Sequence, residues 1–247
     1  MRHIAPYLTR EKYIPIFIKT SVPVGTCSTL ASNLEAMRTD LILGKHYDII
    51  NNPNFFREGS AIHDFMRPDR IILGLKQISQ LAKEYISELY STLKLLHIPF
   101  IYTNFETAEL IKSATVGLVT IKMAFTNEIE KLCKNAGVDL NILLKGIGSD
   151  RRISGESLIF NAGVGGSSLP RTSRLLISSA KKLGVDLSIL SMALDSNIKR
   201  IQSISDKILQ YYSDNNTKFT LKKVAIFGLS FKPLTDDIRE SPSIFVI

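Results

Sequence analysis

An apolar repeat in the middle of the chain constrains its fold more than any other feature. Thr103 followed by Glu106 predicts a capping box, so a helix should begin there. Gly137 is suited to end that helix. The predicted length of roughly 30 residues exceeds the usual ~10–14, so we expect the helix to cross the middle of the molecule and to contribute to a dimer interface. Its main apolar stripe recurs at steps of three or four residues, the spacing of one helix face: Ile111, Ala114, Leu118, Ile121, Phe125, Ile129 and Leu132.

The sequence before this repeat alternates between short apolar runs and helical patterns. The runs are rich in isoleucine, lie near proline or glycine, and cover residues 14–18, 47–51, 70–74 and 98–102. Such runs are typical of buried strands in a parallel sheet, and the apolar spacing over residues 77–96 predicts one crossover helix. A second long helix is predicted from Leu187 to Tyr212. The pattern as a whole indicates an α/β fold.

The last part of the chain predicts a further α/β unit. Residues 223–228, K-V-A-I-F-G, indicate a buried strand that ends in glycine, which is the usual start of a nucleotide-binding unit. Ser241 then offers an N-cap, with Pro242 at the first position of a helix. We therefore divide the chain into residues 1–102, 103–213 and 214–247.

Composition narrows the classes of partner and compartment. The net charge is +8, but the basic residues occur singly or in pairs, which favours small phosphorylated ligands over nucleic acid. Two cysteines, and four histidines without paired spacing, provide neither a disulfide scaffold nor a metal site. The apolar stretches are too short to cross a membrane. We expect a reduced, cytoplasmic protein that does not bind nucleic acid or membrane.

Several segments, in order along the chain, resemble the nucleotide-sugar 6-dehydrogenases, the family that includes UDP-glucose and GDP-mannose dehydrogenases. Residues 19–26, K-T-S-V-P-V-G-T, resemble the family's K-S-T-V-P-x-G-T, and residues 52–59 with 68–71 resemble N-P-E-F-L-R-E-G followed by P-x-R-I. Residues 108–112, A-E-L-I-K, resemble the start of its central helix. Residues 148–153 and 165–170 resemble G-x-D-x-R-I and G-G-S-C-x-P, and residues 228–242 resemble G-x-x-F-K-P-x-T-D-D-x-R-E-S-P.

The resemblance implies a fold and a reaction. The family has an N-terminal Rossmann domain that binds NAD, a central helical dimerisation domain and a C-terminal domain that binds the nucleotide, and it oxidises a sugar C6 alcohol to a carboxylate. Against this pattern we expect residues 1–102 to be the later part of a Rossmann domain, because no G-x-G-x-x-G follows a first strand. Residues 214–247 would be only the start of the nucleotide domain. A nucleotide sugar and a second copy of the chain are the expected partners.

The same resemblance assigns site residues one by one. Lys112 corresponds to the catalytic, substrate-contacting lysine, and Ser168 lies at the position of the catalytic nucleophile. Ser21 and Glu58 correspond to cofactor-side residues, Glu58 also being expected in the catalytic site. The remaining candidates are Arg239 for the cofactor and, for the substrate, Arg152, Gly165, Gly166 and Lys232.

Four positions depart from the family pattern. Ser168 replaces a cysteine, Thr172 an aspartate, Val116 an asparagine and Asn54 a glutamate. Because a serine hydroxyl is negligibly ionised without an adjacent base, the covalent step that a thiolate performs would be lost. We expect dehydrogenase activity to be weak or absent. Two alternatives stay open: a separate chain supplies the NAD loop and only the first oxidation occurs, or the chain is a non-catalytic dimerising module that partners an active paralogue.

Overall fold

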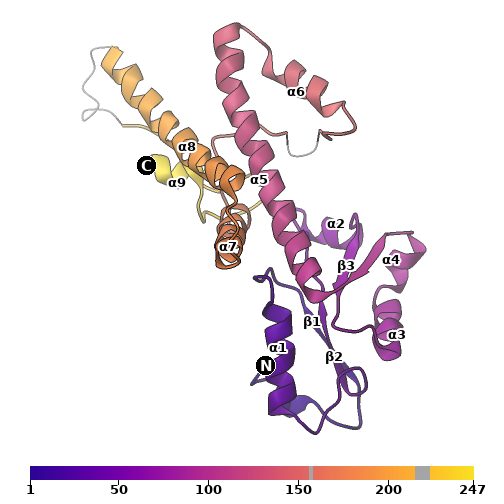
Figure 1. Ribbon diagram of the computed structural model, residues 1–247. Helices are drawn as coiled ribbons and strands as arrows, with labels where there is room; N and C mark the ends of the chain where they lie inside the picture. The colour runs from indigo at the N-terminus through magenta and orange to yellow at the C-terminus, as the bar shows by residue number, and fades with distance from the viewer. Residues whose placement is uncertain (156–157, 215–222) are drawn as a thin grey trace. The chain divides into compact units, whose positions relative to one another are not determined.

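The computed structural model describes residues 1–155, 158–214 and 223–247. They form two compact units, Met1–Ala114 and Thr115–Ile247. Figure 1 shows the elements of both units, with the long helix α5 (Phe105–Ala136) containing the boundary between them.

The first unit is built on a four-stranded sheet in the order β1-β2-β3-β4. β1 (Ile14–Ile18) pairs in parallel with β2 (Tyr47–Asn51), and β3 (Ile71–Gly74) pairs in parallel with β4 (Phe100–Thr103). The sheet is therefore mainly parallel, as predicted. It departs from the prediction where β2 and β3 meet, because their one register pair, Asn51 with Gly74, is antiparallel.

Helices cover both faces of this sheet. Successive residues of a strand point to opposite faces, so Ile49 and Ile50 enter different apolar clusters. Ile49 lies in the cluster of α1 (Thr26–Met37), and Ile50 in that of α3 (Gln80–Leu89) and α4 (Ser91–Leu95). The result is the layered arrangement of a Rossmann-type unit (Figure 1). Two shorter elements complete it, the 3-10 helix Ala5–Tyr7 and α2 (Ala61–Met66).

The single crossover helix predicted over residues 77–96 is wrong. The structure has two helices there, α3 and α4, which are separated at Tyr90. Tyr90 leaves helical geometry with φ −107° and ψ 23°, and its buried hydroxyl donates to the side chain of Asn52. A tertiary hydrogen bond thus accompanies a break that apolar spacing does not reveal.

Helix α5 begins two residues later than the predicted capping box. Thr103 is the last residue of β4, and the side chain of Asn104 caps the helix by accepting from Thr107 N–H at 2.9 Å. Glu106, the expected partner of Thr103, instead accepts from the hydroxyl of Ser28 at 2.5 Å. Gly74 allows this arrangement, because a Cβ there would lie 2.6 Å from Ala108 Cβ.

The second unit is helical. Besides the rest of α5, it contains α6 (Leu140–Gly148), α7 (Leu169–Lys182), α8 (Ser188–Asp214) and α9 (Pro242–Val246). The second predicted long helix is confirmed as α8, and Gly137 follows α5 with a left-handed φ of +68°, as expected of a helix stop. Helices α6 and α7 were not predicted, although Asp139 caps α6 through two backbone amides.

The predicted strand over residues 223–228 is wrong for the described structure. These residues adopt no strand and are exposed. A strand is stabilised by ladder hydrogen bonds to a neighbour, and no described residue pairs with this segment. The helix predicted after Ser241 is confirmed, with Pro242 as the first residue of α9. Within the described ranges, no helix combines the length and the apolar content needed to cross a bilayer.

Candidate functional site

The sequence-predicted site residues are divided between the two units. Ser21, Glu58 and Lys112 lie in the first unit. The others lie in the second: Arg152, Gly165, Gly166, Ser168, Lys232 and Arg239. Each group is positioned by contacts within its own unit.

The turn after β1, which carries the half-buried Ser21, is held at both ends. At its end, a buried carboxylate of α5, that of Glu109, accepts from Gly25 N–H at 2.6 Å and from Cys27 N–H at 2.7 Å. At its start, Lys19 Nζ donates to Asn52 Oδ1 at 2.6 Å. Two backbone amides at the start of α1 are thus satisfied by a side chain distant in sequence.

The loop after β2, which carries Glu58, is anchored by the buried side chain of Asn52. Its Oδ1 accepts from Lys19 and Tyr90, and its Nδ2 donates to the Ile72 carbonyl at 2.9 Å. Further along the loop, Arg57 forms an ion pair of 2.8 Å with Asp64. The half-buried Glu58 therefore lies on a loop attached to both β1 and β3.

Lys112 is the most chemically distinctive of the predicted residues. Its side chain is buried, at 7% exposure, and its Nζ lies 5.1 Å from the centre of the Phe55 ring. Among the described residues no carboxylate forms an ion pair with it. Burial, together with the smaller effect of the nearby charge of Arg70, lowers the pKa of Lys112 to about 8. Such an amine can stabilise a developing oxyanion or exchange a proton near neutral pH.

The implied NAD can be tested against the start of α1, which follows β1 after the turn of residues 19–25. A dinucleotide pyrophosphate binds at such a helix start through backbone N–H groups. Here the amides of Gly25 and Cys27 both donate to the Glu109 carboxylate, so a phosphate would have to displace a buried group of the same charge. The start of α1 therefore does not fit the pyrophosphate.

In the second unit, Gly165 and Gly166 allow close contact with the segment before α9. A Cβ on Gly165 would lie 2.6 Å from the Glu240 carbonyl oxygen, and one on Gly166 would lie 2.7 Å from the Phe231 ring. Gly166 N–H also donates to the Arg239 carbonyl at 3.0 Å. These glycines thus have a packing role here, and they bring the segments of Ser168 and Arg239 together.

Ser168 precedes α7 at the N-cap position, and it is exposed. Its side chain makes no capping hydrogen bond. Within the described ranges, no His, Asp or Glu hydrogen-bonds to its hydroxyl. The hydroxyl therefore lacks the adjacent base that would make it a nucleophile.

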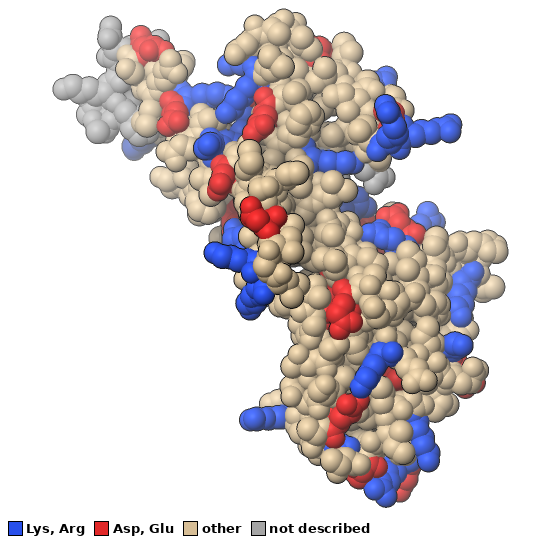
Figure 2. Space-filling model, in the orientation of Figure 1, with Lys and Arg blue, Asp and Glu red and all other residues tan. Residues whose placement is uncertain are grey.

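The two predicted arginines of this unit have the same local setting. Arg152 pairs with Asp150 at 2.6 Å, and Arg239 pairs with Asp237 at 2.8 Å, each acid lying two residues before its arginine. The half-buried Lys232 lies 5.8 Å from the centre of the Phe231 ring. In Figure 2, Lys and Arg side chains are interspersed with Asp and Glu over the face shown, and no large patch of one sign covers it.

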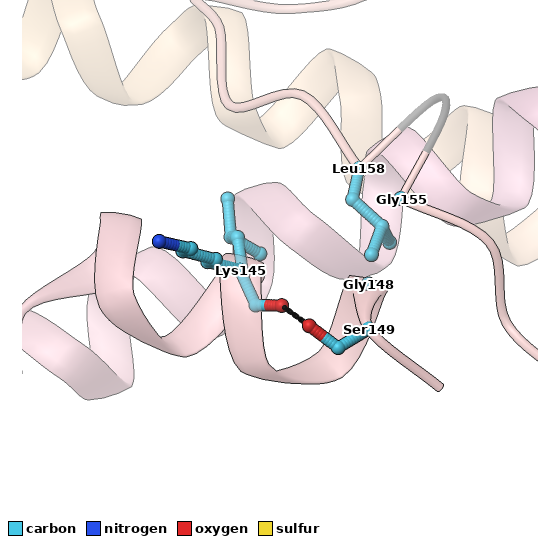
Figure 3. Close-up of a pocket in the computed structure, with 6 residues that line it drawn as sticks. Lys145, Gly148, Ser149, Gly155 and Leu158 are labelled. Carbon is cyan, nitrogen blue, oxygen red and sulfur yellow. Dashed lines mark hydrogen bonds between the residues drawn. The ribbon is translucent and has the colours of Figure 1, made fainter. Parts of the chain in front are cut away.

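A shallow hollow of about 390 Å³ lies beside the Arg152 loop (Figure 3). In it, the Ser149 hydroxyl donates to the Lys145 carbonyl at 2.7 Å. None of the predicted site residues lines this hollow, so it does not define the site. Its lining residues are Leu144, Lys145, Gly148, Ser149, Gly155 and Leu158.

The positions that depart from the family pattern differ in their surroundings. Thr172 and Val116 are buried in the second unit, at 5% and 6% exposure. Neither side chain brings a carboxylate or an amide there. Asn54, in the first unit, is half-buried.

Sequence reasoning missed three residues that shape the first unit's site: Glu109, Arg70 and Phe55. Each lies inside a segment that resembles the family, but the motifs themselves gave them no role. The three-residue spacing between Glu109 and Lys112 on one helix is the signal that could have identified Glu109. The ring contacts of Arg70 and Phe55 join different elements and have no local signal.

Two models of one family match the chain. Residues 1–94 match the NAD binding domain of the UDP-glucose/GDP-mannose dehydrogenase family, and residues 106–199 match the central domain of the same family. Among curated relatives, a UDP-glucose 6-dehydrogenase of Rhizobium meliloti is 33% identical over 246 residues, which are 100% of this chain and 54% of the relative. One from Bacillus subtilis is 34% identical over 236 residues, 95% of this chain and 48% of the relative.

Solved structures give the same result. A UDP-glucose dehydrogenase from Pyrobaculum islandicum has a TM-score of 0.81 at 30% identity, covering 95% of this chain and 52% of that one. A UDP-D-ManNAc dehydrogenase from Pyrococcus horikoshii, at 24% identity, shares the fold with a TM-score of 0.84 over 99% of this chain and 56% of that one. The chain spans about half the length of these relatives. With both family models matching in order along its length, the chain belongs to the UDP-glucose/GDP-mannose dehydrogenase family.

Proposed function

We propose that this chain has the catalytic lysine of an NAD-dependent nucleotide-sugar 6-dehydrogenase, Lys112, but lacks the nucleophilic cysteine, which Ser168 replaces. The parent reaction converts a UDP- or GDP-sugar to its uronate. In this chain we expect that reaction to be weak or absent. The proposal assigns residues 1–102 to the NAD-binding domain, 103–213 to the dimerisation domain and 214–247 to the nucleotide-binding domain. The two buried free cysteines suit a reducing compartment, so we place the protein in the cytoplasm.

The observation that carries the proposal is the exposed hydroxyl of Ser168. Oxidation of an aldehyde to an acid by this route needs a covalent adduct with a nucleophile, and a thiol with an ordinary pKa near 8.5 supplies a few per cent thiolate at neutral pH. A serine hydroxyl needs a base within hydrogen-bonding reach, and no described carboxylate or imidazole hydrogen-bonds to Ser168. The nearby Thr172 has no carboxylate that could act as the base for Ser168.

Lys112 supports the other half of the proposal. Its amine is buried, without a carboxylate partner among the described residues, and it lies on helix α5. An unpaired buried cation is costly, and a negative charge that develops on a substrate oxygen would offset that cost. Under the same proposal Ser21 and Glu58 contact the cofactor, Arg239 also does so, and Arg152, Gly165, Gly166 and Lys232 contact the nucleotide sugar.

The test is uronate formation by the full chain. The wild type and Ser168→Cys are incubated with NAD and UDP-glucose or GDP-mannose, and NADH and uronate are quantified by absorbance and mass spectrometry. We expect no uronate from the wild type or from Ser167→Cys, the matched control, and uronate from Ser168→Cys alone would assign the loss of activity to the missing thiol. Wild-type turnover on the order of 1 per second, ordinary for an enzyme, would refute the proposal.

A second candidate function, a non-catalytic dimerising module, is favoured by the surface of α5. Three large apolar residues of the predicted stripe, Leu118, Phe125 and Leu132, are 51–63% exposed. Between Leu118 and Leu132 the buried positions of the same helix are instead small or polar, namely Thr120, Ala124, Thr126 and Asn127. An apolar helix face of this kind fits a second copy of the chain, or an active paralogue with the same central helix.

A further inference from the structure

Arg70, Phe55 and Lys112 come from three elements of the first unit and meet at one ring. Phe55 lies in the loop after β2, Arg70 directly precedes β3, and Lys112 lies on α5. Arg70 Cζ is 4.1 Å from the centre of the Phe55 ring, and Lys112 Nζ is 5.1 Å from the same centre. Two cationic side chains therefore lie within cation–π distance of one phenyl ring.

Two like charges so close together repel each other, and the repulsion is strengthened because Lys112 is buried. The charged groups around them do not cancel it. On α5, Glu109 is bonded to the amides of Gly25 and Cys27. Beside β3, Asp69 approaches Arg70 only to 3.9 Å, with its side chain 91% exposed. On the loop after β2, Glu58 is half-buried. The pKa of Lys112 is set by the burial of Lys112 itself and by the charge of Arg70.

We propose that Arg70 is a positioning residue for Lys112, held against the same aromatic ring so that its positive charge acts on the Lys112 amine. The inference rests on the proposed function, because it deepens the role of Lys112 in that site. Arg70 stacks its planar guanidinium on Phe55, a geometry suited to arginine. A fixed charge at this place lowers the proton affinity of its neighbour without taking part in the chemistry.

The experiment measures the protonation of Lys112 directly in the full chain. Lysine labelled with ¹³C at Cε is incorporated, the signals are followed by NMR between pH 6 and pH 11, and Lys112→Arg identifies the signal of Lys112. Arg70→Gln and Arg70→Met are expected to raise the pKa of Lys112 by roughly half a unit or more. Arg70→Lys, which restores a positive charge, should keep it close to the wild-type value. Arg67→Gln, at an exposed nearby arginine, is the control and should leave it unchanged.

The two neutral variants protect the test against misfolding. Arg70→Met keeps an unbranched side chain at position 70 while removing its charge, and a native amide spectrum qualifies each variant for the comparison. If both neutral variants misfold, Arg70→Lys decides, because a pKa of Lys112 in it that has risen as far as 10.5 would overturn the proposal. Folded neutral variants with an unchanged pKa of Lys112 would also overturn it. No substrate or NAD is present, so these outcomes are independent of whether the chain forms uronate.

Discussion

Two buried tyrosines of the first unit differ in what their hydroxyl groups contact. The Tyr47 hydroxyl has no hydrogen-bond partner in the described structure, whereas the Tyr90 hydroxyl donates to Asn52 Oδ1. An unsatisfied buried polar group costs about 1–3 kcal/mol. We therefore expect Tyr47→Phe to leave the free energy of unfolding unchanged or to raise it by about 1 kcal/mol. Tyr90→Phe should lower it by about 1–2 kcal/mol. Urea unfolding measures both, and an equal loss in the two variants would contradict the assignment.

Lys112 should reduce the stability of the fold because its amine is buried without a carboxylate partner in the described structure, the same property that suits it to stabilise an oxyanion. Its pKa is about 8 in the folded chain, against 10.5 when unfolded. The folded state therefore binds the proton less well, so the contribution of Lys112 to the free energy of unfolding is most favourable above pH 10.5 and is lost as pH falls through 8. Lys112→Met should raise the free energy of unfolding at pH 7 by about 2–3 kcal/mol. The gain should shrink at pH 10.

Unfolding in urea at pH 7 and pH 10 checks this difference. Lys83→Met, at an exposed position of α3, is the control for adding an apolar side chain. It should show no comparable dependence on pH. A variant that is more stable but lacks function marks a residue retained for chemistry. A destabilised Lys112→Met at pH 7 would show that the amine stabilises the fold.

For single residues, the sequence predicted which residues are candidates for the site better than it predicted their burial and contacts. The motifs indicated Lys112 and Ser168, but neither the burial of Lys112 nor its ring contact could be read from them. Those properties depend on Phe55 and Arg70, which are far from Lys112 in sequence and come close to it only in the folded unit. Local patterns carry no information about such contacts.

Among the elements, the junction of α1 and α5 depends on one carboxylate. Glu109 accepts from two backbone amides while it is buried, and Glu106, one turn earlier, accepts from a single hydroxyl. Glu109→Gln would set an NH₂ group against an amide donor, so we expect a loss of about 2–3 kcal/mol in unfolding free energy. Glu106→Gln is the matched control and should lose less than about 1 kcal/mol. Similar losses in thermal or urea unfolding would argue against Glu109 as the anchor.

The contact of Gly165 with the segment before α9 makes a second prediction for the elements. A methyl group at 165 would lie 2.6 Å from the Glu240 carbonyl and 2.8 Å from Pro242 Cδ. Gly165→Ala should therefore cost about 1–3 kcal/mol through forced backbone movement. Gly146→Ala, in the helix α6 with open space around it, should gain about 0.5–1 kcal/mol instead. A neutral Gly165→Ala in urea unfolding would show that this contact is loose.

The elements also show where the sequence patterns fail. The long helices were predicted because their apolar spacing extends over many turns, and tertiary contacts do not erase it. The start of α5 was misjudged because Thr103 and Asn104 are both good caps, and β4 takes the first of them. The segment 223–228 has the composition of a strand, but a strand also needs a neighbour, which composition cannot supply.

For the whole molecule, the exposed apolar stripe of α5 predicts its assembly. Leu118, Phe125 and Leu132 lie at steps of seven residues, which places them on one side of a helix. Covering them with the same stripe of a second copy would remove a large apolar surface from water, at about 25 cal/mol per Å². We therefore expect a dimer at micromolar concentration, measured as mass by light scattering.

Phe125→Glu tests this assembly, because it places a charge in the centre of the stripe and, in a twofold-symmetric dimer, sets that charge near its own copy. The variant should be monomeric while keeping its helical circular dichroism, since position 125 is half-exposed in the single chain. Val185→Glu, at an exposed apolar position outside the stripe, should remain dimeric. A monomeric wild type would remove the support for a dimerising module. A dimer that survives Phe125→Glu would show that the two copies meet on a different surface, leaving the exposed stripe for another partner.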